Sequence, residues 1–124
     1  MVSPGLRAVL VEGARMGDLD GLDVTRGEAE HPVCGDRVCL SIRCSADRIV
    51  EASWRAAGCP ASMAVAALAA NVLHDVAAAD APALLRSAIA AKGGLAVHER
   101  HAEVMALAAL ASALSRSGDR GSGA

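Results

Sequence analysis

Two consecutive stretches in which apolar and polar residues alternate strictly constrain the fold of this chain most. In residues 37–44 every second residue can face a core: Val38, Leu40, Ile42 and Cys44. Residues 50–56 repeat the pattern with Val50, Ala52, Trp54 and Ala56. A period of two is that of a half-buried strand, and a short turn such as Ser45-Ala46-Asp47 joins antiparallel neighbours. The pattern therefore predicts a β-hairpin over residues 37–56.

The period changes to that of a helix after Gly58-Cys59-Pro60, where one stripe holds Val65, Leu68, Val72 and Val76. A first helix is predicted from the N-cap Ser3 and Pro4, with Gly17 as its end. A third runs from Asp80 to the stop signal at residues 92–94. The last is predicted over residues 97–114, with a core face made of Val97, Val104, Ala108 and Ala111.

Residues 17–30 show no clear period and are predicted to be a loop. The fold class that follows is α+β, with a small antiparallel sheet and helices packed on one of its faces. The chain has 29 alanines and a single aromatic residue, Trp54, which favours closely packed helices over a core of large side chains. We expect one domain over residues 1–114 and a flexible C-terminal tail over residues 115–124.

Composition excludes several functional classes. The net charge is 12 − 14 = −2, so a basic nucleic-acid surface is not expected, and one aromatic residue cannot form a base-stacking platform. The N-terminus lacks the pattern of a signal peptide. The uncharged stretch at residues 56–73 contains Pro60, Ser62 and Asn71 among many alanines, so we expect no membrane span. A cytoplasmic location is the default, where cysteines are more often ligands or reactive thiols than disulfides.

Cys34 and Cys59 are the cysteines whose local sequence suggests chemistry. In Cys34-Gly35-Asp36 the glycine permits a sharp turn that can bring a thiolate and a carboxylate to one metal ion, although the same tripeptide is an ordinary turn. Cys59 stands at a strand-to-helix junction, where free N–H groups and the helix dipole favour a thiolate. A small buried N-cap residue is an equal alternative there. Cys44 is expected in the core, and Cys39, on the other strand face, receives no role.

The chain resembles the iron–sulfur cluster assembly scaffolds of the IscU/NifU N-terminal family. The segment His31-Pro32-Val33-Cys34-Gly35-Asp36 is similar to the family's Asn-Pro-x-Cys-Gly-Asp. An alternating hairpin follows, and then Ala57-Gly58-Cys59-Pro60-Ala61-Ser62, which is similar to its Gly-Cys-x-Ala/Ser motif before a helix. The resemblance extends over about residues 6–114 and implies an IscU/NifU-like α+β fold.

The resemblance also implies a ligand set. The family's third cysteine stands at the start of the last helix, where this chain has His101, and no cysteine follows Cys59. The implied metal ligands are therefore Cys34, Asp36, Cys59 and His101, with Cys59 and Cys34 as persulfide acceptors. The mixture is chemically reasonable, because imidazole and carboxylate bind zinc and histidine replaces cysteine on iron in Rieske-type clusters. On the residues alone, His101 would instead be a histidine half-buried beside the core.

The resemblance implies a non-enzymatic scaffold that binds iron or zinc and a transient [2Fe–2S]-type cluster. Its partners would be a cysteine desulfurase and iron–sulfur acceptor proteins. The family's Leu-Pro-Pro-Val-Lys segment is replaced by residues 94–98, which argues against a dedicated Hsp70-type chaperone partner. The loss of the third cysteine leaves two alternatives open: a zinc-containing persulfide acceptor that builds no cluster, and a binding module that has lost metal chemistry.

Overall fold

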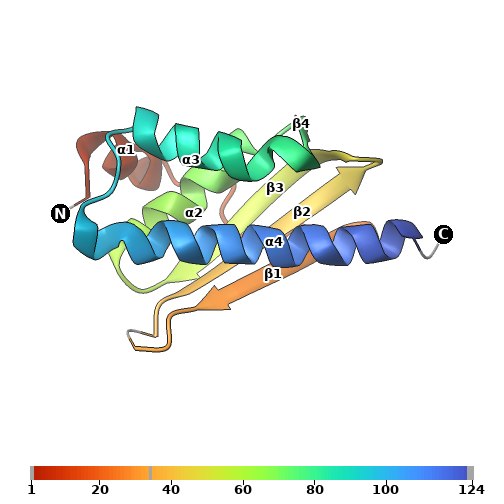
Figure 1. Ribbon diagram of the computed structural model, residues 1–124, viewed down its shortest axis with the longest axis horizontal. Coiled ribbons are helices and arrows are strands. Elements are labelled where there is room, and N and C mark those ends of the chain that lie inside the picture. Colours follow the sequence, from red (N-terminus) through yellow and green to blue (C-terminus); the bar gives the residue numbers. More distant parts are fainter. Residues whose placement is uncertain (1, 34, 123–124) are drawn as a thin grey trace.

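One antiparallel sheet with helices on a single face forms the architecture (Figure 1). The computed structural model describes residues 2–33 and 35–122. The strands lie in the order β1-β2-β3-β4. Their bounds are Val24–Glu30, Arg37–Ser45, Arg48–Ala57 and Val76–Ala77. The helices α1 to α4 span Pro4–Glu12, Pro60–Val72, Ala81–Ala91 and Arg100–Ser122, with single 3₁₀ turns at Ala78–Asp80 and Val97–Glu99. The predicted α+β class is confirmed.

The predicted hairpin is present as β2 and β3, paired from Arg37↔Ala57 to Ser45↔Arg48. Its register shifts at Arg43/Cys44, where β3 carries one extra residue. A bulge of this kind resets the alternation of side chains. Ile49 is consequently fully buried, whereas Val50, predicted to share the face of Ala52, is 36% exposed.

Residues 24–30, predicted as part of a loop, form the edge strand β1 instead. The side of β1 under α4 carries small residues, because the helix backbone lies directly on the strand. A Cβ on Gly27 would collide with the backbone of Ala109, and the Thr25 hydroxyl donates to the carbonyl of Ala113 at 2.9 Å. A strand that needs glycine and threonine on its inner face shows no apolar alternation, so the prediction was wrong.

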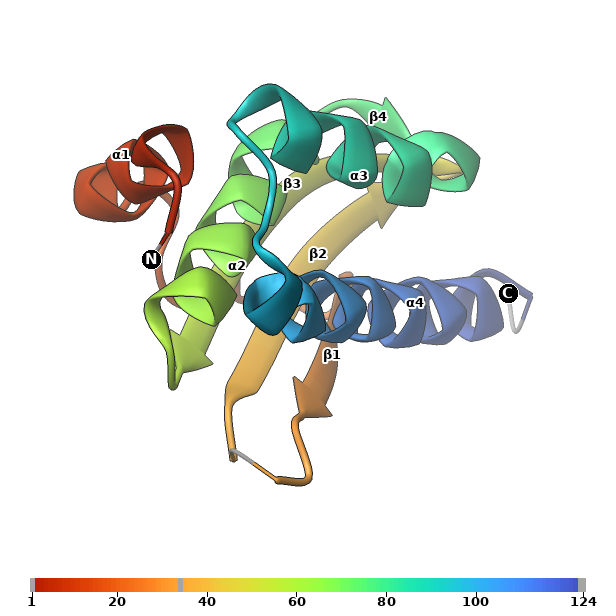
Figure 2. The ribbon, with the colours of Figure 1, turned by 60° about the vertical axis from the view of Figure 1, so that its left-hand side comes forward.

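Helix α2 lies at the centre of the helical layer, between α1 and α4 and over the sheet (Figures 1 and 2). Nine of its thirteen residues are buried, and six of these nine are alanines. Alanine permits the close approach of α1, α3 and α4, as the composition suggested. The helix ends at Val72, so Val76, predicted on the same stripe, lies in β4 instead.

Among the described residues, no helix is both long and apolar enough to cross a membrane.

The face of α4 that contacts the core differs from the predicted one. Val97, in the turn before the helix, and Val104 are 78% and 65% exposed, and Ala108 and Ala111 are exposed as well. The buried stripe consists of Ala102, Met105, Ala106, Ala109, Leu110 and Ala113. The helix also continues to Ser122, beyond the predicted end at Leu114. The flexibility of residues 115–124 stays a prediction.

Helix α1 begins as predicted, because the Ser3 hydroxyl accepts from the N–H of Leu6. It ends earlier than predicted, at the left-handed Gly13 rather than at Gly17. The segment after α1 then runs along the outer edge of β3, where Gly17 donates to the carbonyl of Trp54 at 2.7 Å. The Trp54 indole N–H donates to the carbonyl of Ala14 at 3.0 Å, which fixes this segment to the sheet.

Candidate metal centre

The ends of three elements meet at one end of the sheet. Asp36 immediately precedes β2, Cys59 immediately precedes α2, and His101 is the second residue of α4. The pairing Arg37↔Ala57 places the start of β2 beside the end of β3, and this brings Asp36 next to Cys59. One ligand atom from each of the three residues lies within 4.8 Å of the others. The structure therefore brings together three of the four residues in the predicted set.

The connection between β1 and β2 holds Asp36 in place. The backbone N–H of His31 donates to the carbonyl of Asp36 at 2.8 Å, and the N–H of Gly35 donates to the carbonyl of His31 at 2.9 Å. Gly35 has a φ of 73°, a conformation that glycine adopts without steric cost. Cys34, the fourth predicted ligand, lies outside the described residues, so its place in the set stays a prediction.

Gly58 allows the Asp36 carboxylate to reach the start of α2. Its φ is 128°, and a Cβ at this position would collide with that carboxylate. The next residue, Cys59, is the N-cap of α2, and its backbone N–H donates to Oδ1 of Asp36 at 3.3 Å. A carboxylate beside a helix N-terminus is favoured by the free N–H groups and by the helix dipole. The glycine, the cysteine and the carboxylate thus form one local unit.

The Asp36 carboxylate also binds two further side chains. Its Oδ2 accepts from the hydroxyl of Ser62 at 3.0 Å and lies 3.2 Å from Nε2 of His101. Hydrogen bonding from the Cys59 side chain, from Ser62 and from His101 lowers the pKa of Asp36, although burial opposes this effect. The carboxylate is therefore held in its ionised form, which is the form that binds a metal ion.

Nε2 of His101 is the ring nitrogen that faces the other candidate ligands. It lies 3.4 Å from Sγ of Cys59 as well as 3.2 Å from Oδ2 of Asp36. A thiolate, an imidazole and a carboxylate are the donors found in zinc sites, and the first two also bind iron in clusters. This donor set therefore fits zinc or iron.

Two residues of this centre received no role from the sequence. Ser62 is fully buried, donates to Asp36 and lies 3.5 Å from Sγ of Cys59. Its spacing of three residues from Cys59 on a helix is a signal that could have placed it on the same face. The ring of His31 lies 5.2 Å from that of His101, centroid to centroid. This contact joins different elements, and no spacing in the sequence signals it.

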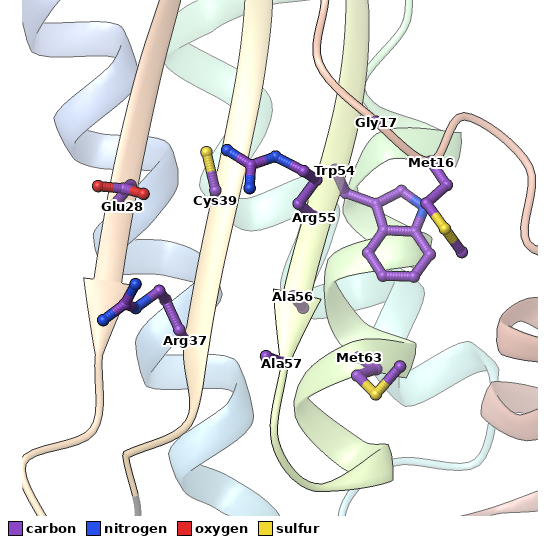
Figure 3. A pocket seen from close by; sticks show the side chains of 10 residues that line it. All are labelled: Met16, Gly17, Glu28, Arg37, Cys39, Trp54, Arg55, Ala56, Ala57 and Met63. Atoms are coloured by element: carbon purple, nitrogen blue, oxygen red, sulfur yellow. The ribbon is translucent and has the colours of Figure 1, made fainter.

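Cys39 and Cys44 lie away from the centre. Cys39 is on the sheet face opposite the helices, between Glu28 and Arg55 (Figure 3), and burial raises the pKa of its thiol. It borders a groove of about 620 Å³ that also includes Met16 and Met63. Cys44 is half-buried against the core, as expected for a small apolar residue.

A smaller hollow of about 350 Å³ opens on Cys59 and His101. Its other walls come mainly from α1 and from the first turn of α2, and they include Leu10, Pro60 and Ala61. The larger groove does not include any of the three candidate ligands. The smaller hollow therefore gives access to Cys59 and His101 from outside the chain, and its lining also includes Arg7, His98 and Glu99.

Comparison with known protein families shows to which family this chain belongs. Residues 12–121 match the family model of the NifU-like N-terminal domain. The chain belongs to this family. The NifU-like resemblance seen in the two cysteine motifs is thereby confirmed. A search of curated proteins gives no match.

Solved structures show the same NifU-like fold. A NifU-like protein (N-terminal) from Brucella abortus is 14% identical over 94% of this chain and 93% of its own, with a TM-score of 0.74. A putative iron–sulfur cluster assembly scaffold protein for the SUF system from Fervidobacterium islandicum is 16% identical over 90% and 95%, with a TM-score of 0.69. A hypothetical protein is 22% identical over 82% and 79%, with a TM-score of 0.54.

Proposed function

We propose that this chain is an iron–sulfur cluster assembly scaffold, with iron and a transient [2Fe–2S]-type cluster as its cargo. The observation that carries the proposal is the convergence of Asp36, Cys59 and His101, whose ligand atoms lie within 4.8 Å of one another. Membership of the NifU-like family supports it, as does the fold shared with a protein described as a scaffold for the SUF system. Cys34 is the proposed fourth ligand.

Each ligand has a distinct task in this proposal. Cys34 and Cys59 supply the sulfur ligands and are the thiols that can accept sulfur as a persulfide. Asp36 supplies an oxygen ligand whose two oxygens already accept hydrogen bonds from Cys59 and Ser62, so its bond to iron is readily exchanged. His101 completes the set, and its neutral imidazole gives a less anionic site than a thiolate would. A scaffold that transfers its cargo needs ligands of this exchangeable kind.

The chain performs no catalytic step of its own in this function. A cysteine desulfurase supplies sulfur, and acceptor proteins take the finished cluster. The apolar hollow beside Cys59 and His101 is the route by which a partner's cysteine reaches the centre. Zinc, which accepts the same donor set, occupies the centre when iron and sulfide are not supplied.

A second candidate function follows from the imidazole at position 101. Because imidazole cannot carry a sulfur atom, the predicted set has two thiols, and the chain could act as a zinc-containing persulfide acceptor that builds no cluster. In that reaction the Cys59 thiolate attacks the outer sulfur of the donor's persulfide. A new S–S bond forms on Cys59, the donor leaves as a thiolate, and there is no net oxidation or reduction.

Anaerobic reconstitution with iron, sulfide and a cysteine desulfurase tests the proposal. We expect visible absorbance of a cluster with bound iron in the wild-type chain, and its loss in Cys59→Ser. The matched control is Cys44→Ser, which removes a thiol away from the centre and should retain the cluster. Absence of both absorbance and metal, with Cys34 and Cys59 reduced, would contradict the scaffold function. Persulfide on Cys59 by mass spectrometry, without a cluster, would favour the second candidate.

A further inference from the structure

Among the described residues, Nδ1 of His101 lacks the hydrogen bond that usually supports a metal-binding histidine. Such a histidine normally donates its second ring N–H to a carbonyl or a carboxylate, and this bond fixes the orientation of the ring. Nε2 of His101 faces Asp36 and Cys59. Within residues 2–33 and 35–122, no hydrogen bond reaches Nδ1. A contact to the ring itself can add to the restraint that Nε2 receives from Asp36 and Cys59.

His31 makes that contact. Its imidazole packs against that of His101 with centroids 5.2 Å apart and ring planes at 71°, an edge-to-face arrangement. Aromatic pairs favour this geometry at such distances, and it restrains both rings. His31 follows the end of β1, whereas His101 lies in the first turn of α4.

His31 is itself fixed by the connection between β1 and β2. Its backbone N–H and carbonyl are both used within this connection, by Asp36 and Gly35. Its Nδ1 accepts the backbone N–H of Val33 at 3.3 Å, so the side chain is tied to its own loop. Pro32 follows directly and restricts the backbone further. A side chain held at these points can restrain the ring that packs against it.

We propose that His31 is a positioning residue of the metal centre, which holds the His101 ring so that Nε2 faces Asp36 and Cys59. The proposal rests on the proposed metal-binding function of the same site. Among the described residues, the group of candidate ligands within 4.8 Å consists of Asp36, Cys59 and His101, so the role proposed for His31 is to orient a ligand. Loss of the ring should weaken metal binding without removing a donor atom.

Zinc affinity, measured on the purified chain by competition with a chromophoric chelator, tests this role. His31→Asn keeps a short polar side chain but removes the ring. We expect a loss of about tenfold, at the lower end of what removal of a ligand-supporting residue costs. The matched control is His74→Asn, because His74 follows the end of α2, at the opposite end of that helix from Cys59, and should leave the affinity unchanged. Circular dichroism and urea midpoints test whether both variants fold.

A double-mutant cycle separates positioning from a general structural effect. In a His101→Cys background no imidazole needs orientation, so His31→Asn should then leave zinc affinity unchanged. Cobalt(II) absorption provides a second measurement, since His31→Asn should alter the ligand-field bands of the wild-type chain but not those of His101→Cys. Equal zinc affinity in the wild-type chain and His31→Asn, or an equal loss in both backgrounds, overturns the proposal and leaves the metal site intact. A wild-type chain that binds no zinc removes the metal site on which this proposal rests, whereas the scaffold function is decided separately by the reconstitution with iron and sulfide.

Discussion

Asp36 is the residue on which the candidate centre depends most. Its carboxylate contacts the N-cap of α2 through the Cys59 N–H, the first turn of that helix through Ser62, and the start of α4 through His101. The residue is 5% exposed, so these contacts replace water almost completely. A buried carboxylate is costly unless it is hydrogen-bonded or paired. The same contacts that prepare a ligand therefore also stabilise this end of the fold.

Ser62→Ala should destabilise the metal-free protein by about 1–3 kcal/mol, because it leaves a buried, charged acceptor with one donor fewer. Urea unfolding in the presence of a chelator measures the difference. Ser41→Ala is the matched control, since Ser41 is equally buried but its hydroxyl has no hydrogen-bond partner among the described residues. That substitution should be neutral or stabilising. Equal costs at the two serines would show that the Ser62 hydrogen bond contributes nothing.

The lowered pKa of Asp36 predicts a dependence of stability on pH. Because the folded pKa lies below the ordinary value of 3.8, ionised Asp36 favours the folded state. The contribution is complete above the unfolded pKa and is lost as the pH falls through the folded one. The difference in unfolding free energy between the wild-type chain and Asp36→Asn should thus be largest near neutral pH and shrink below about pH 4. A difference independent of pH, measured without metal, would contradict this assignment.

At the scale of elements, the sequence predicted best where the two sides of an element differ in polarity. The β2–β3 hairpin alternates sharply, and Gly58-Cys59-Pro60 marks the start of α2, so both were predicted closely. Strand β1 and the buried face of α4 were not. The two failures share one cause, since β1 and α4 pack through glycine and alanine, and small residues carry no periodic signal. Asp36, Cys59 and His101 could be placed together from the resemblance, and the spacing of Ser62 from Cys59 was a usable signal, whereas His31 required the structure.

Gly27→Ala tests the close packing of β1 under α4. The added methyl group would collide with the backbone of Ala109, which cannot move without displacing the helix. We expect destabilisation of about 1–3 kcal/mol, as for other overpacked sites, seen as a lower urea midpoint. Glu28→Ala is the control on the same strand, where the side chain is exposed on the other face and its loss should cost about 0.5 kcal/mol or less. A neutral Gly27→Ala would mean that α4 lies further from β1.

At the scale of the whole molecule, the candidate ligands come from segments far apart in the chain. Cys34 and Asp36 belong to the connection before β2, Cys59 begins α2, and His101 begins α4. The starts of α2 and α4 lie at the same end of the sheet as the start of β2 (Figure 2). A bound metal ion would therefore connect the sheet with two helices. The free energy of metal binding at this site therefore adds to the free energy of unfolding, because the site exists only in the folded chain.

Zinc should accordingly raise the thermal stability of the whole chain. A ligand that binds the folded state alone adds about 2.7 kcal/mol at a free concentration of 100 times its Kd. For a domain of this size that corresponds to an increase in Tm of about 10 °C. Differential scanning calorimetry with and without zinc measures it, and a chelator should reverse it. His101→Ala and Cys59→Ser should lose most of the increase, whereas Cys39→Ser, on the opposite face of the sheet, should retain it. The same increase in all three variants would place the bound zinc elsewhere on the chain.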